Sequence, residues 1–131
     1  MIIEKSQFSE HQIAKLVKGS VVPRPIAWIS SVGKSGIFNL APYSYFQVIS
    51  HNPIMFIISI GKGANVGKKG DKDTLANIKE TGDFVINLVS SRLADQMHKS
   101  SHIFPKDVSE FEETGLTPAK SKLITAPRVE E

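Results

Sequence analysis

Three stretches of the sequence carry residue types that can hold a charged ligand at fixed positions. In the first, Arg24 lies between Pro23 and Pro25. Each proline fixes its own φ and favours extended geometry in the residue before it, so the arginine is held on a rigid, extended segment. A guanidinium held in this way is a fixed fork of donors. The alternative is a surface arginine beside an edge strand.

The second stretch, residues 39–46, places small and polar residues where a strand should otherwise be apolar. Proline has no backbone N–H, so Pro42 is expected to break the hydrogen-bond ladder at this point. Neighbouring backbone groups would then be free to meet a ligand. The alternative is an edge strand with a bulge.

The third stretch, residues 62–77, joins a loop rich in glycine and lysine to the start of a helix that Asp73 is expected to cap. A helix N-terminus attracts phosphate because its first backbone N–H groups lack partners and its dipole is positive there. Three lysines add positive charge: Lys68, Lys69 and Lys72. The alternative is a solvated loop whose lysines bind nothing specific.

Other chemical motifs are excluded. The loop that begins at Gly61 has valine where a dinucleotide-binding fingerprint needs glycine. Gly63 and Gly67 enclose too few residues for the phosphate-binding loop of nucleoside triphosphatases. With no cysteine, the chain can form no disulfide and no thiolate metal site. His98 and His102 have helical spacing without the glutamate of a zinc-protease motif, so no metal site is expected.

The elements that position these stretches are mostly strands. The capping-box spacing of Ser9 and Gln12 predicts a short helix that ends at Gly19, and Gly82 should end a helix over 74–80. The apolar run 54–60 should be a strand covered on both faces. Further strands are expected at 26–30, 37–46, 84–89 and 122–125, and a helix around 93–97. Hairpin spacing favours an antiparallel sheet or barrel.

Composition fits one ordinary domain. The 131 residues carry a net charge of only +3, so no nucleic-acid partner is expected. The N-terminus does not read as a signal peptide, and the longest apolar stretch is far too short to cross a bilayer. A cytoplasmic protein with no membrane partner is the expectation.

Five short segments in one order resemble the flavin reductase-like, FMN-binding split-barrel family: residues 23–28, 39–46, 52–56, 72–78 and 84–89. The resemblance runs from about residue 19 to 89 and more loosely to the end of the chain. It implies a mainly β fold with short helices, a six-stranded antiparallel Greek-key barrel and a homodimer. Family domains generally run on beyond this length, so residues 1–131 are expected to form one such domain that lacks its last strands.

The resemblance also implies FMN as the cofactor and NAD(P)H as a transient electron donor. Hydride transfer to flavin depends on stacking and alignment more than on a side-chain acid or base, so no catalytic residue is predicted. Arg24 is a candidate cation for stabilising reduced flavin. Two alternatives remain: a bound-FMN electron carrier without reductase activity, and a non-enzymatic module that has lost flavin. The expected cofactor-binding residues are Arg24, Pro25, Ile26, Ala27, Asn39, Ala41, Pro42, Tyr43, Ser44, Ser59, Gly61, Lys68, Lys69, Asp73, Thr74 and Asn77.

Overall fold

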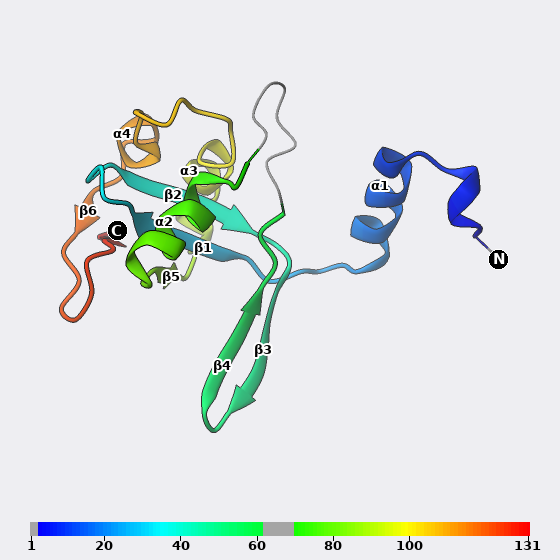
Figure 1. Cartoon of the computed structure of the whole chain (residues 1–131), viewed down its shortest axis with the longest axis horizontal. Coiled ribbons are helices and arrows are strands. Elements are labelled where there is room, and N and C mark those ends of the chain that lie inside the picture. Colours follow the sequence, from blue (N-terminus) through cyan, green and yellow to red (C-terminus); the bar gives the residue numbers. More distant parts are fainter. Residues whose placement is uncertain (1–2, 62–69) are drawn as a thin grey trace.

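A computed structural model describes residues 3–61 and 70–131. Its central sheet is antiparallel, with strands in the order β2-β1-β5 (Figure 1). The strands are β1 (Ala27–Val32), β2 (Phe38–Tyr43) and β5 (Val85–Asn87). Every residue of β1 is buried, because the strand has a neighbour on each edge and packed side chains on both faces. The strand expected at 26–30 is therefore confirmed at the centre of the fold.

Successive residues of β1 point to opposite faces of the sheet and so contribute to two separate cores. Trp28 packs with Leu40, Phe111 and Leu116 on one face. Its indole N–H donates to the buried Ser100 hydroxyl at 2.9 Å, which satisfies the ring's one polar group. On the other face, Ala27 and Ile29 pack with Tyr43, and partly buried apolar side chains surround them.

The helices lie around this sheet, apart from α1 (Glu10–Ser20), which follows a short 3-10 helix (Lys5–Gln7) and stands away from the body (Figure 1). The capping box is confirmed: Ser9 Oγ accepts from the Gln12 backbone at 3.3 Å, and Gln12 Oε1 accepts from the Ser9 backbone at 2.9 Å. The predicted end at Gly19 is wrong by one residue. The helix includes Gly19 and ends at Ser20, whose hydroxyl donates to the Leu16 carbonyl at 2.7 Å.

Helix α2 (Asp73–Thr81) begins one residue earlier than expected. Asp73 is its first helical residue rather than its cap, and Lys72 holds the cap position without a side-chain bond. Gly82 ends the helix in the left-handed conformation, with φ of 77°, as predicted. The remaining helices are a 3-10 turn (Ser91–Leu93), α3 (Ala94–Lys99) and α4 (Glu110–Thr114).

Strands β3 (Phe46–His51) and β4 (Ile54–Ile58) form a hairpin that projects from the sheet (Figure 1). The turn predicted at Asn52-Pro53 is confirmed. The prediction that 54–60 is covered on both faces is wrong, since β4 is largely exposed and Ile54 is 75% exposed. An apolar run indicates a strand that needs covering, but periodicity does not say what covers it.

Two further expectations are corrected. Pro42 does not interrupt the returning strand but lies within β2 opposite Trp28; β2 is an edge strand, where proline is tolerated. Residues 122–125 are not a strand. They join β6 (Pro118–Ala119) to β7 (Arg128–Val129), and Asp83 holds their end by accepting three hydrogen bonds from Thr125 and Ala126.

The fold is thus mixed, with short helices and antiparallel strands. The described strands form one three-stranded and two two-stranded sheets, and the six-stranded Greek-key arrangement stays a prediction. Within residues 3–61 and 70–131, no helix has the length and hydropathy needed to span a bilayer.

Candidate functional site

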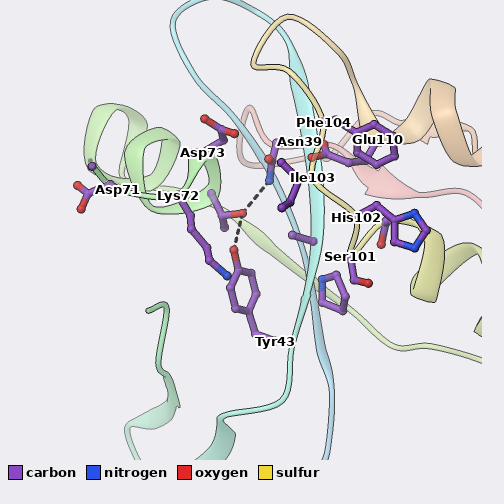
Figure 2. A pocket seen from close by; sticks show the side chains of 15 residues that line it. Asn39, Tyr43, Asp71, Lys72, Asp73, Ser101, His102, Ile103, Phe104 and Glu110 are labelled. Carbon is purple, nitrogen blue, oxygen red and sulfur yellow. Dashed lines mark hydrogen bonds between the residues drawn. The ribbon is translucent and has the colours of Figure 1, made fainter. Parts of the chain in front are cut away.

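A buried hydroxyl lies at the centre of the candidate site. Thr74 Oγ1, in the first turn of α2, accepts from Asn39 Nδ2 at 2.8 Å and from the Tyr43 hydroxyl at 3.0 Å (Figure 2). Alternation along β2 puts Asn39 and Tyr43 on the same face, the one that meets α2. Thr74 is only 1% exposed. Within the described ranges, no acceptor is found for the Thr74 hydroxyl hydrogen.

A second layer of polar contacts fixes this arrangement from behind. Ser31 Oγ accepts from Asn39 Nδ2 at 3.4 Å and from Asn77 Nδ2 at 3.2 Å. The close approach of α2 to β1 depends on Gly33, where an added Cβ would come within 2.5 Å of Asn77 Oδ1. The network therefore ties β1, β2 and α2 together beneath the site.

A cavity of about 140 Å³ opens beside Thr74. Its walls are β2 from Asn39 to Tyr43, the chain at 70–74, the loop 100–104 and Glu110 (Figure 2). Pockets for drug-sized ligands typically have volumes of roughly 300–1,000 Å³. A cavity of this size accommodates one polar end of such a ligand rather than the whole molecule.

The positive charge at the cavity comes from Lys72 and from the start of α2. Because Lys72 contributes no side-chain cap, the first backbone donors of this nine-residue helix are left for another acceptor. The Lys72 ammonium lies 5.6 Å from the centre of the Tyr43 ring. Asp71 forms an ion pair with Lys79 at 2.7 Å, and Asp73 forms one with Lys106 at 3.8 Å. Lys72 is thus the ammonium that remains available to an anion in the described wall.

Burial changes the protonation behaviour of two acidic groups in the wall. It raises the pKa of Tyr43, against a smaller opposing effect of the hydrogen bond to Thr74. It also raises the pKa of Glu110, although the Leu40 N–H bond partly offsets this. Tyr43 therefore acts as a neutral hydroxyl donor at physiological pH.

Arg24 is not the free fork of donors that the sequence suggests. Its Nε donates to Ser44 Oγ at 3.2 Å, and its Nη1 donates to the carbonyls of Lys18 and Val21. The guanidinium ties the end of α1 to the end of β2, and neither Arg24 nor Ser44 lines the cavity. Ser44 directly follows Tyr43 in the sequence. The Arg24–Ser44 hydrogen bond and the Tyr43–Thr74 hydrogen bond therefore involve adjacent residues of the chain.

The other predicted site residues fall into three groups. Ala41, Pro42 and Asp73 line the cavity with Thr74, while Asn77 lines a second cavity of about 340 Å³ that Asn39 and Asp73 also border. Away from both cavities are the exposed Pro25, the half-buried Ile26, the buried Ala27, and the exposed Ser59 and Gly61. Lys68 and Lys69 lie outside the described residues.

Sequence reasoning missed two parts of the cavity wall. Neither the loop 100–104 nor Glu110 is among the predicted site residues. Ser109 precedes Glu110 in a pattern typical of a helix start, which was the available signal. Nothing in the local pattern indicates that a glutamate in the first turn of α4 would be only 9% exposed.

Comparisons with known proteins agree with the fold. An uncharacterized protein of Aquifex aeolicus is 44% identical over 117 residues, which are 89% of this chain and 58% of that protein. Nitrilotriacetate monooxygenase component B from Bacillus cereus superposes with a TM-score of 0.91 at 35% identity, over 99% of this chain and 62% of that one. A split-barrel protein from Shewanella frigidimarina NCIMB 400 gives a TM-score of 0.81 at 28% identity, over 100% and 64%.

The chain thus spans about three fifths of the length of these relatives. Its likeness to them covers the central sheet and the site, and the solved structures share the split-barrel architecture that the resemblance implied. The model of the family described as "Flavin reductase like domain" matches residues 19–131. The chain belongs to the flavin reductase-like domain family.

Proposed function

We propose that this chain binds FMN and takes part in NAD(P)H-dependent reduction of flavin, as a homodimer. The observation that carries the proposal is the Thr74 centre, in which a buried hydroxyl, an uncapped helix start and a lysine converge on one small cavity. This set of donors suits a phosphate group, which is a dianion with several acceptor oxygens.

The residues around the cavity fit the phosphate and ribityl end of FMN. Thr74 and Lys72 would donate to the phosphate, with Lys68 and Lys69, which precede them in the sequence. Asp73, Asn77 and Asn39 would hold the helix start and β2 in place. The flavin ring would extend toward the end of β2 and the Arg24 segment. The remaining predicted contacts with the flavin are Pro25, Ile26, Ala27, Ala41, Pro42, Tyr43 and Ser44, and Ser59 and Gly61 are predicted to lie near the ribityl or phosphate end.

When bound, FMN supplies the redox chemistry by accepting a hydride equivalent from the nicotinamide. The protein's part is to bind and orient the cofactor. Arg24 contributes a cation at the end of β2 that would favour the reduced, more negative flavin. Because three of its hydrogen bonds go to Ser44, Lys18 and Val21, it would act through its charge and not as a free fork.

The first test is titration of the purified protein with FMN, followed by the quenching of flavin fluorescence. Thr74→Val keeps the side-chain volume but leaves the Asn39 and Tyr43 donors without their acceptor. The variant also lacks the hydroxyl that would donate to the phosphate, and a hydrogen bond to a charged group is worth about 1.5–3 kcal/mol, so we expect FMN affinity to fall at least tenfold. Riboflavin, which has no phosphate, should bind the wild type weakly.

Thr117→Val is the matched control, because Thr117 is exposed and lies away from the cavity. It should bind FMN as the wild type does. Oxidation of NAD(P)H on addition of FMN distinguishes a reductase from a bound-flavin carrier. Failure of the wild type to bind FMN would overturn the proposal and leave a non-enzymatic module with the same fold.

A further inference from the structure

Glu110 uses its buried carboxylate to hold the outer edge of β2. Its Oε2 accepts from the Leu40 backbone N–H at 3.0 Å, while the inner edge of β2 pairs with β1. An edge strand presents backbone donors that need partners, and here a side chain from α4 supplies one. Leu40 lies between Asn39 and Ala41, which both line the cavity, so this bond fixes the strand at the centre of the site.

The carboxylate also borders both cavities, whose walls carry charged or titratable groups from several elements. From β2 and the loops these are Tyr43, Lys34, His102, Lys106 and Asp107; from α2 and its start they are Asp71, Lys72, Asp73 and Glu80. Three lysines and four other carboxylates therefore line the two cavities, and α3, which packs against α4, carries Asp95, His98 and Lys99. No lysine or arginine in the described ranges forms an ion pair with Glu110, whereas Asp71 and Asp73 each have one.

Burial without a cation makes the charged form of Glu110 costly. This raises the pKa of the carboxyl, and the negative charge of Asp73 adds to the effect. A phosphate dianion in the same cavity would be a further negative charge close by. It would disfavour ionised Glu110 again, because like charges a few ångströms apart repel strongly where water is excluded.

We propose that Glu110 is the positioning residue of the FMN site and that it takes up a proton when the phosphate binds, so that FMN affinity rises as the pH falls. This rests on the proposed function. The sign follows from linkage: a ligand that favours the protonated form binds more tightly at lower pH, through the window between the pKa of the free protein and that of the complex. At most one proton is taken up per FMN.

Two substitutions separate positioning from proton uptake. Glu110→Gln keeps an oxygen that can accept from the Leu40 N–H but cannot titrate. Glu110→Ala removes the acceptor, and we expect roughly tenfold weaker FMN binding together with faster hydrogen exchange at the Leu40 amide. In Glu110→Gln, exchange at Leu40 should stay slow. Glu112→Gln, on the exposed face of the same helix, should match the wild type in both measurements.

The closing experiment measures FMN affinity for the wild type and Glu110→Gln by calorimetry between pH 5 and 8, in two buffers of different ionisation enthalpy. The phosphate of free FMN itself titrates near pH 6 and this contribution is the same for both proteins, so the difference between them reports the coupling to Glu110. We expect the wild type to gain affinity relative to Glu110→Gln as the pH falls and to take up additional protons. Equal pH dependence in the two proteins would overturn the coupling while leaving FMN binding intact. Absence of FMN binding in the wild type would overturn the proposed function as well.

Discussion

Asp83 shows how one carboxylate can hold a segment that has no regular structure of its own. It accepts from the Thr125 backbone and hydroxyl and from the Ala126 backbone at 2.9–3.2 Å. The Thr125 N–H is the largest of the effects that lower the pKa of Asp83. These bonds hold Ala126, which is fully buried. The segment is thus ordered by a residue some forty positions away.

At neutral pH we expect Asp83→Asn to lower the free energy of unfolding by about 1 kcal/mol, because a carboxylate accepts these bonds better than an amide does. Since the folded-state pKa is lowered, the stability from ionised Asp83 is complete above the unfolded-state pKa near 4 and is lost as the pH falls through the folded-state value. Urea unfolding at several pH values tests this. The gap between the two proteins should be constant from pH 6 to 8 and narrow below about pH 4. A gap that persists unchanged in acid would contradict the account.

At the scale of elements, the sequence predicts helix ends and turns well, but it predicts poorly which distant segments pack against a strand. The capping box at Ser9, the stop at Gly82 and the turn at Asn52-Pro53 each depend on chemistry within a few residues, and all three are found. The exposure of β4 and the lack of a strand at 122–125 depend on distant segments, which periodicity cannot reveal.

The candidate site follows the same division. Asn39, Tyr43 and Thr74 come together as expected, because strand alternation and a helix start determine where they point. Arg24 donates hydrogen bonds to carbonyls at the end of α1, a contact that no local sequence pattern indicates. Glu110 enters the site from a helix that lies seventy residues beyond its partner Leu40. Long-range partners of this kind are the part that the sequence alone cannot supply.

The contact between β1 and α2 makes a prediction at the element scale. In Gly33→Ala the new Cβ would meet Asn77 Oδ1 at 2.5 Å and Glu80 Oε2 at 3.1 Å. Both side chains would have to move, which would disturb the bonds from Asn77 to Ser31 and from the Lys34 N–H to Glu80. We expect unfolding free energy to fall by about 1 kcal/mol.

Gly19→Ala is the matched control for Gly33→Ala. Gly19 lies inside α1 with no atom near the position of a Cβ, so alanine there should leave the protein as stable or raise stability by up to about 1 kcal/mol through helix propensity. Thermal unfolding of both variants tests the pair. Equal shifts in the two would show that the packing of α2 on β1 is looser than the structure indicates.

At the scale of the whole molecule, α1 and the β3–β4 hairpin both extend from a compact body (Figure 1). Residues 46–58 contain no aspartate, glutamate, lysine or arginine, and seven large apolar side chains in or beside the hairpin are at least 44% exposed. Within the described residues, the outer edges of β3 and β4 have no strand beside them. Uncharged, unpaired edges of this kind readily pair with another chain.

The proposed homodimer therefore has a test at the hairpin. Val48 and Ile57 point to opposite faces, because Val48 pairs with Phe56, the residue before Ile57. Lysine at both positions would place a charge on each face, so we expect Val48→Lys with Ile57→Lys to weaken self-association at least tenfold in sedimentation equilibrium. Leu123→Lys, at an even more exposed apolar residue outside the hairpin, should associate as the wild type does. A wild-type protein that stays monomeric at every concentration would contradict the proposed homodimer. Equal association of the hairpin variant would place the interface elsewhere, because two charges in an apolar contact cannot be accommodated without cost.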